Sequence, residues 1–138
     1  MGYDLSRFVE AQSPVYPSVV RELRDGRKRS HWMWFVFPQL AGLGRSPTAE
    51  HYAIDGLDHA RQYLAHPVLG ARLRECAGIV ASLSAGPDDV FGTVDALKLC
   101  SSMTLFLRAA PGETVFADVL ERHYGGEADP ATDRLLES

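Results

Sequence analysis

The nine residues 21–29 contain five cations and only two acids. Lys28 and Arg29 end this basic stretch, and Trp32 and Trp34 follow closely. Cationic side chains can hold a phosphate group, and indole rings can stack on a flat base. The stretch therefore predicts a site for a phosphorylated aromatic ligand. The alternatives are a solvated helix end, where cations favour the helix dipole, and tryptophans that pack in the core.

Two polar residues, His31 and Gln39, bracket the aromatic run, and we expect both to contact the same ligand. The run between them holds more large apolar side chains than one buried face can accept. We therefore predict that Trp32 and Phe35 are buried and that Trp34 or His31 lines a cavity.

A glycine loop forms the second candidate site. Gly44 and Arg45 lead into Ser46 and Pro47, a typical helix start with an N-cap followed by proline. Backbone N–H groups at such a start can bind an anion, and an arginine adds a fork of donors for phosphate. We predict that Gly44, Arg45 and Ser46 bind a phosphate. The alternative is an ordinary turn before a capped helix.

A lysine with two hydroxyls forms the third candidate. Lys98, Ser101 and Ser102 share one helical face at spacings i, i+3 and i+4. A lysine beside hydroxyls can bind phosphate or activate a nucleophile, so Lys98 is a candidate catalytic residue. Small hydroxyl residues also permit close helix packing, which is the structural alternative.

The fourth candidate pairs the carboxyl group of Glu10 with the amide of Gln12. Such a pair suits sugar hydroxyls and general acid–base chemistry, so Glu10 is the second candidate catalytic residue. An exposed surface glutamate is the alternative. The five histidines have neither mutual spacing nor acidic partners typical of ligands, so we expect no metal and no cofactor.

The composition fits a single domain over residues 1–138. Hydrophobic residues make up 46% and charged residues 23%, as in ordinary globular proteins. The net charge of −4 argues against a protein that coats nucleic acid. Cys76 and Cys100 lie far apart, so we expect free thiols and a reduced setting. With no signal peptide and no apolar run able to span a bilayer, we predict a cytoplasmic protein without membrane partners.

Helical periodicity and Pro/Gly breaks predict an all-α fold, a single compact domain of seven or eight short helices with irregular packing. We expect Asp4, Ser46 and Thr93 as N-caps. The expected helices cover residues 5–12, 15–25, 47–53, 57–64, 67–83, 93–110, 113–124 and 130–136, with short pieces near 27–39 and 90–92.

Five segments carry a family resemblance, namely Phe8–Gln12, Ser30–Gln39, Gly42–Ser46, His66–Gly70 and Lys98–Phe106. Through them, and over nearly the whole chain, the sequence resembles the domain of unknown function 1810 family. This resemblance implies an all-helical single domain and no established biochemical activity.

The order of Phe-x-x-Ala-Gln, a Gly-Arg loop and His-Pro-x-Leu is also similar to the NADAR family of ADP-ribose N-glycosidases. That similarity implies a nucleotide-sugar ligand. The predicted function is therefore a cleft for a phosphorylated nucleotide-like ligand of the ADP-ribose type, with N-glycoside hydrolysis as the candidate reaction. The alternative is a non-catalytic module that binds protein or nucleic acid through residues 27–39.

Overall fold

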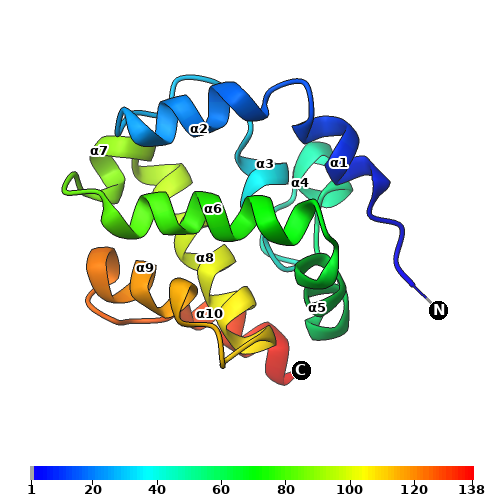
Figure 1. Ribbon diagram of the computed structural model, residues 1–138. Helices are drawn as coiled ribbons and strands as arrows, with labels where there is room; N and C mark the ends of the chain where they lie inside the picture. The colour runs from blue at the N-terminus through cyan, green and yellow to red at the C-terminus, as the bar shows by residue number, and fades with distance from the viewer. Residues whose placement is uncertain (1) are drawn as a thin grey trace.

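The computed structural model describes residues 2–138 and is all-α, with no strand in that range (Figure 1). Its ten helices are α1 (Ser6–Gln12), α2 (Tyr16–Arg24), α3 (Met33–Val36), α4 (Pro47–His51), α5 (Leu57–Ala65), α6 (Leu69–Ser82), α7 (Pro87–Phe91), α8 (Thr93–Ala109), α9 (Thr114–Tyr124) and α10 (Pro130–Glu137). The eight expected helices are all present. Of the other two, α3 lies within the expected piece 27–39. Helix α7 begins at Pro87, three residues before the expected piece 90–92, and overlaps it only at Val90 and Phe91.

Helix α8 is the centre of the fold. It packs against α5, α7, α9 and α10, while α6 crosses in front of it between α2 and α9 (Figure 1). Over half of α8 is buried, including Leu99, Met103 and Phe106, because it has neighbours on several sides. Lys98 therefore projects from a central helix that packs against four others.

One of the three expected N-caps has the predicted form, and a second is displaced by one residue. The Ser46 hydroxyl accepts from the backbone N–H of Ala49, as expected for an N-cap. At α1 the cap position belongs to Leu5, so Asp4 lies one residue before it. The Asp4 carboxylate still accepts from the backbone N–H of Ser6 at 3.0 Å and so satisfies a donor at the helix start.

The third expected cap is wrong for a steric reason. Thr93 is the first residue of α8 and not its N-cap. The cap position belongs to Gly92, whose φ of +80° turns the chain sharply out of α7. A threonine is strained at such a φ, whereas glycine adopts it freely.

The basic and aromatic segment bridges α2 and α4. Gly26 turns the chain with φ +71°, and the N–H of Lys28 donates to the Val90 carbonyl oxygen at 2.8 Å. Trp32 is buried as predicted, with 1% of its surface exposed. Phe35 is only partly buried and packs against the core from its edge. The segment is therefore folded onto the body of the protein along most of its length.

Both cysteines are free thiols, Cys76 buried and Cys100 partly so. Burial raises the pKa of Cys76 to about 12 and that of Cys100 to about 11. Neither thiol is thus a nucleophile at neutral pH. Within residues 2–138, no helix combines the length and the apolar character that crossing a membrane requires.

Candidate functional site

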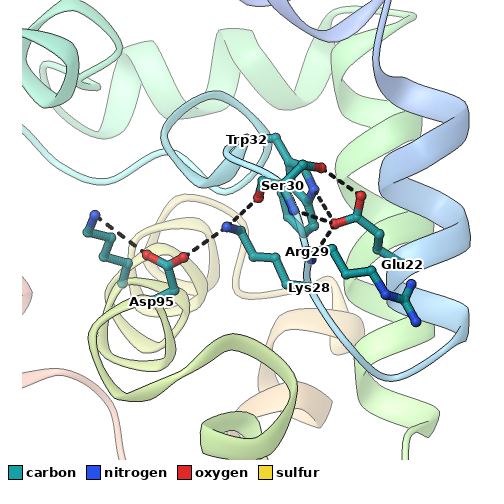
Figure 2. A network of polar contacts seen from close by, with 7 residues as sticks. Glu22, Lys28, Arg29, Ser30, Trp32 and Asp95 are labelled. Carbon is teal, nitrogen blue, oxygen red and sulfur yellow. Dashed lines mark hydrogen bonds and ion pairs between the residues drawn. The ribbon is translucent and has the colours of Figure 1, made fainter.

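A buried carboxylate, Glu22, organises the loop after α2 (Figure 2). Its Oε1 accepts from the backbone N–H of Arg29 at 2.6 Å and of Ser30 at 3.0 Å. The same atom accepts from the indole Nε1 of Trp32 at 3.1 Å, and Oε2 accepts from the Ser30 hydroxyl at 2.6 Å. Four donors thus converge on one carboxylate and fix the position of the Trp32 ring.

These hydrogen bonds hold Glu22 in its ionised form. Burial alone would raise the pKa of Glu22, because it disfavours the charged form. The hydrogen bonds from Ser30, Arg29 and Trp32 outweigh burial and lower the pKa from 4.5 to about 2. Both carboxylate oxygens of Glu22 accept hydrogen bonds from the loop itself, so Glu22 is a structural anchor for the loop.

Lys28 is held nearly as firmly. Its Nζ donates to the carbonyl oxygen of Ser30 at 2.6 Å and lies 3.0 Å from Oδ2 of Asp95 (Figure 2). It also lies 5.1 Å from the centre of the Trp32 ring, as a cation over an aromatic face. Only 8% of the side chain is exposed. Lys28 therefore ties the loop to the start of α8.

Lys98 meets the same carboxylate from the other side, but loosely. Its Nζ lies 3.6 Å from Oδ1 of Asp95, beyond hydrogen-bond distance, and 5.2 Å from the centre of the Trp34 ring. A quarter of the Lys98 side chain is exposed, and Trp34 is partly exposed as well. Lys28 and Lys98 are the only lysines of the chain. We call Lys28, Asp95, Lys98 and Trp34 the lysine-pair cluster.

Gln12 lies elsewhere and has a structural role in this arrangement. It is buried, and its Nε2 donates to the carbonyl oxygen of Phe35 at 2.6 Å and to the hydroxyl of Tyr63 at 3.0 Å. Glu10 is exposed two residues earlier on α1, so the two side chains project from different sides of the helix. The structure thus separates the pair that the sequence suggested.

The two serines of α8 are covered. Ser101 donates to the carbonyl oxygen of Leu97 and to Oδ2 of Asp129, both at 3.1 Å. Ser102 is fully buried, and its Oγ has no hydrogen-bond partner among the described residues. The shared helical face is real, but the chain around Asp129 covers its serine end and leaves Lys98 accessible.

A second group of predicted residues surrounds the start of α4. Gly44 packs so closely that an added Cβ would lie 2.5 Å from that of Ala49 and 4.0 Å from Oε1 of Gln39. Ser46 caps the helix, and Arg45 is exposed beside it. Within residues 2–138, no hydrogen bond or ion pair links this group to the lysine-pair cluster.

Four surface hollows are lined by residues other than the predicted ones. Neither Trp34 nor His31 lines them, and His31 is exposed. One hollow of about 220 Å³ begins at Leu97, the residue before Lys98. In the part of the chain that the structure describes, no group of three or more His, Cys, Asp or Glu residues could hold a metal ion.

The family model described as "Protein of unknown function (DUF1810)" matches residues 2–136. The chain belongs to the DUF1810 family. Among solved structures, it is similar to the conserved hypothetical protein Rv1873 from Mycobacterium tuberculosis, known from a crystal structure at 1.38 Å. The identity is 55%, the TM-score is 0.96, and the match covers 99% of this chain and 98% of that one. Among curated proteins, none matches.

In this DUF1810 chain, the sequence reasoning missed both carboxylates, Glu22 and Asp95. Asp95 precedes Lys98 by three residues, a spacing that brings side chains together on a helix, and this signal was available. Nothing in the sequence, however, shows that Lys28 reaches the same carboxylate. The role of Glu22 also depends on a loop that folds back over eight to ten positions.

Proposed function

We propose that this DUF1810 protein binds a phosphorylated, nucleotide-like ligand of the ADP-ribose type at the lysine-pair cluster. Lys98 contacts the phosphate, Lys28 adds positive charge behind it, and Trp34 supplies an aromatic face for the base. The observation that carries the proposal is the loose pairing of Lys98, whose Nζ stays 3.6 Å from Asp95 while its side chain is a quarter exposed.

The charges of the cluster favour an incoming anion. Two ammonium groups share one carboxylate, so the cluster carries a surplus of one positive charge. An ammonium group has three donors, and Lys28 uses two of its own. Within residues 2–138, Lys98 has its long ion pair with Asp95 and its contact with the Trp34 ring, and donates no short hydrogen bond. A phosphate oxygen can therefore bind Lys98 without breaking a short hydrogen bond. A base can stack on Trp34, since stacking needs only an accessible part of the ring.

Isothermal titration calorimetry with ADP-ribose tests the proposal. We expect saturable binding that weakens as salt rises, because the contact is partly exposed. Replacing Lys98→Gln should weaken binding about tenfold, the scale of one charge-assisted hydrogen bond. Arg134→Gln, which removes an exposed cation from α10, is the matched control and should bind as the unchanged protein does. Absent binding at millimolar ADP-ribose, or equal affinity of Lys98→Gln, would contradict the proposal.

The residues around α4 extend the proposal to a longer ligand. Arg45 is exposed, and within residues 2–138 its side chain takes part in no hydrogen bond or ion pair, so it can hold a second phosphate. Gly44 and Ser46 flank it in the chain, and Gln39 lies near Gly44. Arg45→Ala should then weaken the binding of ADP-ribose by about 1.5–3 kcal/mol. The affinity for AMP, which has a single phosphate, should not change. Equal losses for both ligands would place Arg45 and Lys98 at the same phosphate.

Hydrolysis of an N-glycosidic bond stays a prediction. It needs a carboxyl group beside the bound ribose, and the candidates are Glu10, from the sequence, and Asp95, from the cluster. Incubation with NAD and chromatography for released nicotinamide tests it, with Glu10→Gln and Asp95→Asn as variants. Unchanged NAD after prolonged incubation would leave binding as the whole activity.

A second candidate function is a module that binds an anionic macromolecule. The observation in its favour is that Arg21, Arg24 and Arg27 are exposed and, within residues 2–138, take part in no ion pair. Fluorescence anisotropy with a labelled single-stranded RNA separates the two functions. Binding that is lost when these three arginines become glutamine, and retained in Lys98→Gln, would support the module.

A further inference from the structure

Two side chains beside Lys98 are unusually exposed for their type. Val94 and Leu97 each have 67% of their surface accessible, whereas the other exposed large apolar residues reach 38% or less. They lie three residues apart and hence on one face of α8. Two exposed side chains are not a patch by themselves, but they contribute to a binding surface where they continue into further apolar surface.

The face continues into a hollow. Leu97 forms one wall of the cavity of about 220 Å³, and Cys100, Tyr124 and Pro130 form others. The Tyr124 hydroxyl is occupied by the carbonyl oxygen of Ala96 at 2.6 Å. Burial, with a smaller contribution from the Asp129 charge, raises the pKa of Cys100 to about 11. The hollow therefore offers neither a reactive thiol nor a free tyrosine hydroxyl. Two carboxylates also line it: Glu127 is exposed, and Oδ2 of Asp129 accepts from the hydroxyls of Ser101 and Thr132. An apolar occupant fits the side of the hollow formed by Leu97, Cys100, Tyr124 and Pro130.

Helix geometry connects this hollow to the lysine-pair cluster. Looking down α8, Lys98 lies on one side of Leu97 and Cys100 on the other, since successive residues are offset by about 100°. The arc from Lys98 to Cys100 around a helix about 10–12 Å wide is about 15 Å long. Leu97 and Val94 cover the surface between them. A single elongated ligand can contact all three features.

We infer that the phosphorylated ligand carries an acyl-pantetheine-like arm that crosses Leu97 and places its apolar acyl end in the hollow beside Cys100. This inference rests on the proposed function, since the lysine-pair cluster must hold the phosphate. An arm of about a dozen atoms in extended form spans the arc. The occupant follows from charge and shape, because a loosely held ammonium group adjoins an apolar strip and cavity.

Three probes test the inference by calorimetry. The head is 3′-phosphorylated ADP, which carries the same three phosphates as coenzyme A and is called ADP below; octanoyl-coenzyme A supplies head and arm, and octanoyl-pantetheine supplies the arm alone. We expect octanoyl-coenzyme A to bind about tenfold or more tighter than ADP, and octanoyl-pantetheine to bind weakest. Leu97→Ser should remove the gain from the arm and leave ADP affinity unchanged. Val68→Ser, at another exposed aliphatic residue, is the matched control and should change neither.

Each contrary result has a distinct meaning. Equal affinity for ADP and octanoyl-coenzyme A overturns the arm and leaves the proposed function standing. No binding of either overturns both. If octanoyl-pantetheine binds as tightly as octanoyl-coenzyme A, the phosphates add nothing to the affinity, and the inference that the arm and the lysine-pair cluster hold one ligand fails. If light scattering shows a dimer that Leu97→Ser dissociates, the face belongs to a second copy of the chain and the inference fails.

Discussion

Two carboxylates on either side of the Lys28 loop use similar partners in opposite ways (Figure 2). Glu22 is buried and accepts four hydrogen bonds of 2.6–3.1 Å. Asp95 is paired with two cations, one at 3.0 Å and the other at 3.6 Å, and lies nearer the solvent. Trp32 donates to Glu22, whereas Trp34 lies against Lys98, the more distant of the two cations that pair with Asp95.

The two carboxylates differ in whether the donors around them have unused hydrogen-bonding capacity. Every donor around Glu22 is satisfied inside the protein, so an external ligand would gain nothing there. Around Asp95, by contrast, Lys98 keeps donors that no short bond uses. The comparison indicates that residue types alone do not mark a site; the unused bonding capacity of an accessible group does. The predictions below separate the anchor from the site.

Removal of the anchor should have the largest effect. Glu22→Ala leaves four donors without their acceptor, among them the indole N–H of the buried Trp32, at a cost of about 3 kcal/mol in the free energy of unfolding. For a domain of this size, the melting temperature should fall by roughly 10 °C. Glu10→Ala, at an exposed glutamate of α1, is the control and should change it little. A Glu22→Ala protein as stable as the control would refute the anchor.

Acid should weaken the anchor in a defined range. Because the pKa of Glu22 is lowered from 4.5 to about 2, its contribution to stability is fully present above the unfolded value and is lost as the pH falls from about 5 to about 2. The melting-temperature gap between the unchanged protein and Glu22→Gln should therefore narrow over this range. A constant gap would mean that ionisation of Glu22 is not what stabilises the loop.

Substitutions of the two lysines should lower the free energy of unfolding by different amounts. Lys28→Gln breaks a short hydrogen bond and a mostly buried ion pair, and we expect a loss of about 1–2 kcal/mol. Lys98→Gln breaks a long, partly exposed ion pair and a partly exposed cation–π contact with Trp34, and should cost less, about 0.5–1 kcal/mol. Urea denaturation measures both. Equal losses would show that Lys98 is held just as firmly by the protein and would remove the basis of the site.

Removing the charge of Asp95 should strengthen ligand binding, whereas removing that of Lys98 should weaken it. Asp95→Asn removes the carboxylate that competes with phosphate for Lys98, so ADP-ribose should bind about threefold to tenfold tighter. The variant should be slightly less stable, because Lys28 loses its charge partner. Titration calorimetry gives the affinity. Weaker binding in Asp95→Asn would mean that the carboxylate positions the lysines or contacts the ligand itself.

Much of the fold could be predicted because it depends on local signals. Helical periodicity and Pro/Gly breaks located the helices to within a few residues. The Ser46–Pro47 pair correctly predicted the N-cap of α4. The Lys28–Asp95 contact joins residues far apart in sequence, and no local pattern encodes it. At Gln12 the sequence suggested a functional role where the structure shows a structural one. Its amide was expected to bind a ligand, and it instead donates to the carbonyl oxygen of Phe35 and so ties α1 to that segment.

The most direct test is to observe the two lysines separately. Biosynthetic labelling with ¹³C-lysine leaves both ammonium groups unmodified and gives each lysine its own Hε–Cε NMR signal, assigned with Lys28→Arg and Lys98→Arg. On titration with ADP-ribose, we expect the Lys98 signal to shift saturably and farther than that of Lys28. Signals that both stay fixed at concentrations well above millimolar, or a shift confined to Lys28, would contradict the account.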